Sequence, residues 1–164
     1  MQKEQYLTFF IRGEEYAVGI LRVKEIIEYE TVTRVPATPE HVRGVINLRG
    51  AVLPVVDLAA KFGQGSIEPA RTTCIVVVET RMDGELLTVG LIADSVSEVV
   101  DIADEAIEPP PSFGTHVRVD FLIGMAKLDG RLALVLDIDR ILSPADVQQA
   151  IDAATETEPA AEVA

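Results

Sequence analysis

The fold of this chain is decided by residues 43–58, which read RGVINLRGAVLPVVDL. Two apolar stretches lie on either side of Arg49-Gly50, and glycine supplies the positive φ that a tight turn needs. The stretch therefore predicts a β-hairpin. Asp57 follows the hairpin directly and precedes LAAKF and Gly63, a pattern typical of a short helix with an aspartate N-cap.

The same pattern returns further along the chain. Residues Gly44, Leu48, Gly50, Val55 and Asp57 recur 80 positions later as Gly124, Leu128, Gly130, Val135 and Asp137. Upstream residues Gly13, Glu14, Val18 and Gly19 recur 71 positions later as Gly84, Glu85, Val89 and Gly90. Residues Val23, Glu25 and Ile26 recur 73 positions later as Val96, Glu98 and Val99. Their shared order indicates an internal duplication, two copies of one small barrel.

Turn signals divide each copy into strands. They are Arg12-Gly13, Arg49-Gly50, Asp83-Gly84 and Asp129-Gly130. Together with the apolar stretches between them, they predict about five strands in each half. The first half is expected to contain strands at 6–11, 14–19, 24–29, 42–47 and 51–56. The second is expected to contain strands at 72–79, 85–92, 96–102, 121–128 and 131–137, so the fold class is mainly β.

Composition narrows the range of functions. The chain has 164 residues, of which 48% are hydrophobic, but only five Phe, three Tyr and no Trp. Its core must therefore consist mainly of Val, Ile and Leu. The formal charge of −13 repels phosphate backbones and anionic lipids, which argues against nucleic acid or a membrane surface as the direct partner. No apolar run reaches the roughly 18 residues that a membrane helix needs, so we expect a cytoplasmic protein.

Residues that could carry catalysis or bind metal have simpler explanations. His41 and His116 are isolated, and Cys74, the single cysteine, lies in a strand pattern that predicts a structural thiol. Asp57 and Asp137 could be paired catalytic carboxylates, but their identical contexts favour helix capping. The sequence predicts no cofactor and no metal. A small barrel hydrolase or transferase, the competing hypothesis, would need an acid/base cluster that the sequence does not contain.

The hairpin at 43–58 closely resembles the signature of the CheW family, the coupling proteins of bacterial chemotaxis. Other stretches are also similar to the family pattern, namely 14–20, 23–26, 32–36, 38–39, 90–92, 96–99 and 134–137. The resemblance implies a single CheW-like domain at about 5–153 with two SH3-like five-stranded β-barrel lobes. Lobe 1 is expected at about 12–68, lobe 2 at about 71–142, a C-terminal helix at about 143–153 and an acidic, Ala-rich tail at 154–164.

The resemblance also implies a function. Members of this family tether a histidine autokinase, through its CheW-like regulatory domain, to the cytoplasmic tips of methyl-accepting chemoreceptors. This chain is therefore expected to be a non-catalytic adaptor that is recruited to receptor arrays at the inner membrane, where ring or array assembly could follow. An adaptor of the same type that serves surface motility or second-messenger control remains an alternative.

Residues of the family's binding surfaces can be carried over onto this sequence. The residues expected in or near the receptor groove are Glu25, Ile26, Asn47, Leu48, Arg49, Cys74 and Val99. Those expected at the kinase contact are Val23, Arg43 and Gly44. Glu25 and Arg49 resemble a pair that the family holds close together. Arg43 is interpreted as an exposed charge that faces an acidic partner.

Overall fold

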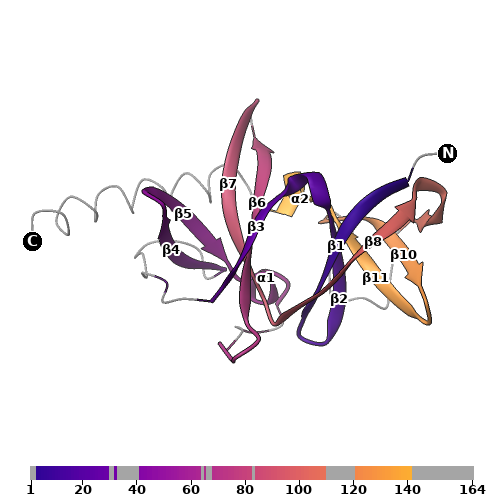
Figure 1. Cartoon of the computed structure of the whole chain (residues 1–164), viewed down its shortest axis with the longest axis horizontal. Helices are drawn as coiled ribbons and strands as arrows, with labels where there is room; N and C mark the ends of the chain where they lie inside the picture. Colours follow the sequence, from indigo (N-terminus) through magenta and orange to yellow (C-terminus); the bar gives the residue numbers. More distant parts are fainter. Residues whose placement is uncertain are drawn as a thin grey trace, which may run out of the picture.

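The computed structural model describes residues 3–29, 32, 41–63, 65, 68–82, 84–109 and 121–141, which form two β-sheets side by side (Figure 1). The first sheet has the order β8-β1-β2-β11-β10-β9. Its strands are β1 (Lys3–Ile11), β2 (Glu14–Gly19), β8 (Ser95–Ala103), β9 (Ile107–Glu108), β10 (Leu122–Leu128) and β11 (Arg131–Leu136). The second sheet has the order β3-β6-β7-β5-β4. Its strands are β3 (Val23–Glu28), β4 (Val42–Leu48), β5 (Ala51–Val56), β6 (Cys74–Met82) and β7 (Glu85–Ala93).

Helices in the described residues are short. They are α1 (Leu58–Lys61), α2 (Ile138–Ile141) and two 3₁₀ turns, η1 (Ile20–Arg22) and η2 (Asp104–Ala106). The predicted mainly β class is therefore confirmed. The two-residue strand β9 was not expected from the sequence, because it is held only by pairing with Met125 and Ala126 of β10. The expected C-terminal helix at 143–153, the tail at 154–164 and His116 lie outside the described residues.

The duplication is confirmed in the backbone. The bounds of β10, β11 and α2 are those of β4, β5 and α1 shifted by 80 residues. Both hairpins also carry a register shift at the same place, between Val42 and Gly44 and between Leu122 and Gly124. Each hairpin leads into its helix through an aspartate that caps it, and the Oδ1 atom of Asp57 accepts hydrogen bonds from the backbone N–H groups of the next turn. The two hairpin–helix units are thus copies of one design.

The two sheets do not follow the two halves of the sequence. By the same intervals, β1, β2 and β3 correspond to β6, β7 and β8. Apart from the additional β9, equivalent strands therefore follow the same order in both sheets. The first hairpin of each half, however, lies in the sheet of the other half. Strand β2 runs parallel to β11, with Tyr16 opposite Leu134, and β7 runs parallel to β5, with Gly90 opposite Val55. The expected lobe boundaries at 12–68 and 71–142 therefore do not separate the sheets.

A shared core joins the two sheets. Its fully buried side chains include Phe9 and Tyr16 of the first sheet and Ile75 and Leu91 of the second. As expected from the composition, most of its members are aliphatic, and burying them is the main favourable term for folding. A smaller cluster around Tyr6 lies inside the six-stranded sheet and is completed by Ala17, Ile102, Ala126, Ala133 and Val135.

Candidate protein-binding site

The Glu25–Arg49 pair is a two-pronged ion pair in the structure. Glu25 lies on β3, and Arg49 lies at the tip of the β4–β5 hairpin. The guanidinium donates from Nη1 to Oε2 over 2.6 Å and from Nη2 to Oε1 over 2.8 Å. The hydrogen bonds from Arg49 hold the pKa of the Glu25 carboxyl below its usual value. Strands β3 and β4 are the two outermost strands of their sheet, so this pair joins one end of the sheet to the hairpin at the other end.

A hydrogen bond within the turn fixes the conformation of the hairpin tip. Asn47 Oδ1 accepts a hydrogen bond of 2.9 Å from the Gly50 backbone N–H, which closes the turn around Arg49. Arg49 adopts a φ of 53°, an uncommon value for a residue with a side chain. Leu48 is half-buried and packs against the shared core. The turn therefore fixes the position of the Arg49 backbone, and Glu25 fixes the position of its guanidinium.

Strand β3 places Glu25 and Ile26 on opposite faces. The half-buried face holds Val23, Glu25 and Ile27, whereas Ile26 is 43% exposed on the other face. Val99 on β8, an outermost strand of the six-stranded sheet, is 49% exposed. Each sheet thus presents one large exposed aliphatic side chain on an outer strand, at positions that the duplication makes equivalent.

A second ion pair occupies the corresponding place in the six-stranded sheet. Glu98, the duplicate of Glu25, contacts Arg131 at the start of β11. The Nε atom of Arg131 also donates to the buried carboxylate of Glu15 over 2.7 Å, and the other oxygen of Glu15 has no hydrogen-bond partner. This contact was not predicted from the sequence, because the duplicate of Arg49 is Asp129 and the arginine stands two residues later.

Cys74 belongs to the core. Its side chain is buried between Glu28 of β3 and Ala93 of β7, its neighbours in the sheet. Burial, followed by the charge of Asp94, raises the pKa of the thiol, so it stays protonated and unreactive. The prediction of a structural thiol is confirmed.

The interpretation of Arg43 as an exposed charge is wrong. Its Nη2 atom lies 2.8 Å from Oδ2 of Asp57, and the two side chains are only 19% and 1% exposed. Asp57 caps α1 with Oδ1 and therefore presents its second oxygen to β4. Gly44, the next residue, is buried opposite Val55 at the register shift. Arg43 therefore holds β4 to the start of α1.

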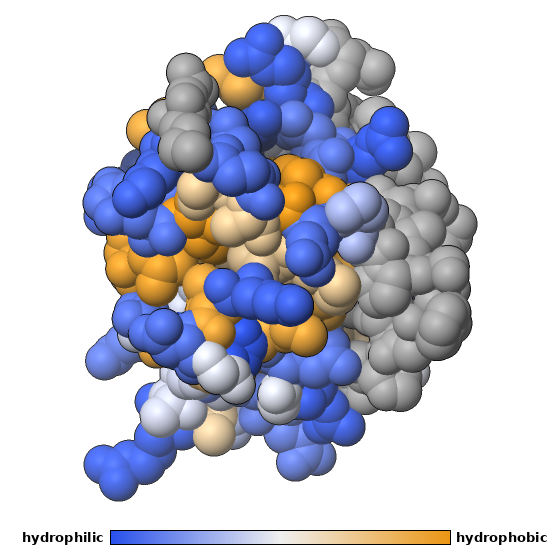
Figure 2. Space-filling model, turned by 90° about the vertical axis from the view of Figure 1, so that its right-hand side faces the viewer, coloured by the Kyte–Doolittle hydropathy of each residue, from blue (hydrophilic) through white to orange (hydrophobic). Residues whose placement is uncertain are grey.

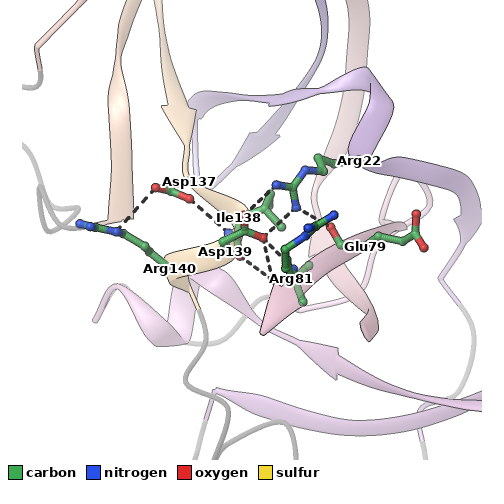
Figure 3. A network of polar contacts seen from close by, with 8 residues as sticks. Arg22, Glu79, Arg81, Asp137, Ile138, Asp139 and Arg140 are labelled. Carbon is green, nitrogen blue, oxygen red and sulfur yellow. Dashed lines mark hydrogen bonds and ion pairs between the residues drawn. The ribbon is translucent and has the colours of Figure 1, made fainter. Parts of the chain in front are cut away.

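Figure 3 shows a polar network that sequence analysis did not identify. Arg22 of η1 donates from Nη1 and Nη2 to both carboxylate oxygens of Asp139 on α2, each over 2.7 Å. The Arg81 backbone N–H donates to Asp139 Oδ1 over 2.8 Å, and Thr80 Oγ1 donates to the same oxygen over 3.3 Å. Arg22 also donates to the Glu79 carbonyl over 3.2 Å. One carboxylate thus joins η1, α2 and β6.

The charge of Asp139 should contribute stability that acid removes. The Arg22 fork, assisted by the Arg81 N–H, lowers the pKa of Asp139 from 3.8 to about 2. A carboxyl whose pKa falls on folding stabilises the folded state above its unfolded pKa and loses that contribution as the pH falls through the folded pKa. Between pH 5 and pH 2, the urea midpoint should therefore fall further for the wild type than for Asp139→Asn, with about 1 kcal/mol at stake because the pair is partly exposed. Parallel pH profiles would contradict this expectation.

The end of the six-stranded sheet carries a further apolar surface. Figure 2 shows apolar residues there, framed by hydrophilic ones. A hollow of about 420 Å³ is lined by Tyr6, Ile107, Pro109 and Ile123 together with the carboxylate-bearing Asp104 and Glu108. Ile123 is 53% exposed.

Within the residues that the structure describes, no group of three or more His, Cys, Asp or Glu could hold a metal ion. None of the helices in that part of the chain is long and apolar enough to cross a membrane.

Comparison with known proteins agrees with this architecture. The family model "CheW-like domain" matches residues 5–146. The chain is 36% identical over 140 residues to the chemotaxis protein CheW of Klebsiella aerogenes, covering 85% of this chain and 82% of that one. It is 32% identical to the chemotaxis protein CheW of Bacillus subtilis, covering 90% and 92%. The crystal structure of the scaffolding protein TtCheW from Thermoanaerobacter tengcongensis superimposes with a TM-score of 0.78 at 32% identity, covering 89% and 92%. This chain belongs to the CheW family.

Proposed function

We propose that this protein is a chemotaxis scaffold that couples a histidine autokinase to the cytoplasmic tips of chemoreceptors. It performs no chemistry itself and acts by presenting two binding surfaces on one rigid body. Family membership and similarity to chemotaxis proteins over most of both chains support this function. The supporting observation in the structure is the Glu25–Arg49 pair, because a two-pronged ion pair on an exposed hairpin tip offers fixed polar groups to a partner.

The receptor surface is proposed to lie along β3, the β4–β5 turn and β8. Ile26 and Val99 supply exposed apolar area, and Arg49 supplies a directional donor at its edge. A helical hairpin, the shape of a receptor tip, binds through apolar contacts with a few polar anchors, and arginine is among the strongest anchors. Asn47 and Leu48 shape the turn, and Cys74 supports β3 from within the sheet.

The kinase surface is proposed to include the first residue of β3 and the register shift of β4. Val23 is half-buried on β3, and Gly44 lies at the register shift of β4. Arg43 contributes to this surface through Asp57, because their ion pair fixes the start of β4. Recruitment to receptor arrays at the inner membrane, and ring or array assembly there, would follow from simultaneous engagement of kinase and receptor.

The function can be tested with purified components. The chain is mixed with its cognate kinase and a soluble receptor signalling fragment, and complex formation and kinase autophosphorylation are measured. A ternary complex in which the receptor controls autophosphorylation is the expected result. If the chain binds neither protein, the proposed coupling function is wrong. If it binds a kinase of another chemosensory pathway instead, it serves that pathway.

The Glu25–Arg49 pair should act as one unit in binding. We expect Arg49→Ala and Glu25→Ala each to weaken receptor binding, and the double variant to bind about as weakly as either single variant. Both side chains are solvent-accessible, so thermal unfolding should change little. Isothermal titration with the receptor fragment measures the double-mutant cycle. Leu86→Ala, which removes an exposed side chain of β7, is the control. Additive losses from the two single changes would show that the residues contribute independently.

A further inference from the structure

We propose that the Arg22–Asp139 ion pair is a positioning contact that sets the two sheets at the angle needed to present β3 to its partners. This inference rests on the proposed coupling function. Neither residue belongs to the expected binding surfaces. Neither has a counterpart of the same charge in the other half, since the duplicate of Asp139 is Ala59 and that of Arg22, at the interval of 73 residues, is Ser95.

The pair lies where the chain crosses from one sheet to the other. Strand β2 belongs to the six-stranded sheet, and β3 belongs to the five-stranded sheet, with only η1 between them. Arg22 is the last residue of η1, directly before Val23. Any movement of Arg22 therefore passes directly into the strand that carries Val23, Glu25 and Ile26.

Asp139 anchors Arg22 to both sheets at once. Helix α2 follows β11 of the six-stranded sheet after a single residue, Asp137. The Asp139 carboxylate also accepts the Arg81 N–H, and Arg81 lies on β6 of the five-stranded sheet, the strand that pairs with β3. The Thr80 hydroxyl, also on β6, shares its hydrogen between Asp139 Oδ1 and the Ile138 carbonyl, over 3.3 and 3.2 Å, and so adds a further contact between β6 and α2. The network therefore connects the crossing segment with both sheets.

The rest of the contact between the sheets cannot fix an angle equally well. The shared core is apolar, and apolar contacts are non-directional. A guanidinium fork on a carboxylate requires one plane and one distance. At the second crossing, between β7 and β8, Asp94 bonds to the backbone of Phe10 and Arg12 over 2.8 and 2.7 Å. Both crossings are thus held by directional bonds. At the β2–β3 crossing these bonds join two side chains, whereas at the β7–β8 crossing they involve backbone groups of Phe10 and Arg12.

The angle between the sheets can be measured directly. Spin labels are attached to cysteines introduced at exposed Glu85 of β7 and Lys127 of β10, and the native cysteine is removed by Cys74→Ala. The distance between the two labels, measured by pulsed electron paramagnetic resonance, reports the angle. The labelled chain without a further change is compared with Arg22→Ala, Asp139→Ala and Arg140→Ala. The Arg140 control sits on the same helix and pairs only weakly with Asp137, at 3.8 Å, with its side chain exposed. Arg22→Ala and Asp139→Ala should shift or broaden the distance distribution, and Arg140→Ala should leave it unchanged.

Binding is measured on Arg22→Ala, Asp139→Ala and Arg140→Ala made in the wild-type chain, with Cys74 in place and no labels. Arg22→Ala and Asp139→Ala should bind the kinase and the receptor fragment about tenfold more weakly, although every residue of the proposed surfaces is intact. The charge-swapped double variant Arg22→Asp, Asp139→Arg should recover part of this loss, because it places opposite charges at the two positions again.

The outcomes separate this inference from the proposed function. If the wild-type chain binds neither partner, the proposed function fails, and the distance distributions still show whether the pair sets the angle between the sheets. A lower urea midpoint with unchanged distances and unchanged binding overturns the positioning role. Altered distances with unchanged binding by a functional wild type overturn the link between the angle and coupling.

Discussion

Arg43→Glu is expected to lower the free energy of unfolding by several kcal/mol. The substitution would place two carboxylates together at a site where Asp57 is almost fully buried and already caps α1. Removing one partner of a buried ion pair costs about 3–5 kcal/mol. This is a large part of the free energy of unfolding of a domain, which is roughly 5–15 kcal/mol. Urea unfolding followed by circular dichroism measures the loss.

Arg71→Glu is the matched control, because it makes the same charge reversal at an exposed arginine. It should leave the urea midpoint almost unchanged. Equal midpoints for the two variants would show that the Arg43–Asp57 pair contributes nothing to stability. The expected loss of stability also means that weaker kinase binding by Arg43→Glu would not by itself place Arg43 in the interface.

Gly124→Ala is expected to detach β9 from the six-stranded sheet. A Cβ at residue 124 would lie 2.3 Å from the Glu108 carbonyl oxygen and 2.7 Å from Cγ2 of Ile107. The first of these atoms is backbone, so β9 must move away, and overpacking of this kind costs about 1–3 kcal/mol. Thermal unfolding should show the loss, and hydrogen exchange should show faster exchange at the β9 and β10 amides that pair with each other.

Gly19→Ala provides the comparison. A Cβ there meets nothing within 4 Å, and its φ of −53° suits any residue. The variant should be as stable as the wild type or slightly more so, because alanine restricts the unfolded chain. If Gly124→Ala were equally harmless, β9 would not pack against β10 as closely as the structure has it.

Local features of the fold were predictable from the sequence because local chemistry determines them. The Arg49-Gly50 and Asp129-Gly130 turns, the alternating flanks and the capping aspartates all act within a few residues. The exchange of the first hairpins was not predictable. The apolar pattern of β2 suits any free strand edge, and nothing within it indicates β11 rather than β5 as the neighbour.

In the candidate site, too, contacts between residues far apart in the sequence could not be predicted from local chemistry. The contact between Glu25 and Arg49 was expected from family resemblance, and their 24-residue separation alone would not have indicated it. Arg43 was misinterpreted because a charge in a sequence does not reveal whether a neighbouring carboxylate will bury it. The Arg22–Asp139 pair spans 117 residues and ends on a four-residue helix, so no periodicity or motif points to it.

The hairpin exchange has a consequence for synthesis on the ribosome. Strands β1 and β2 leave the ribosome before the other strands of the two sheets, yet β2 finds its parallel neighbour only when β11 appears, with Glu15 opposite Ala133. During that interval the nascent chain carries a hairpin with an unpaired edge, the kind of edge to which other chains can add. Translation therefore sets the order of assembly: the five-stranded sheet can be completed once β7 has emerged, and the six-stranded sheet must close last.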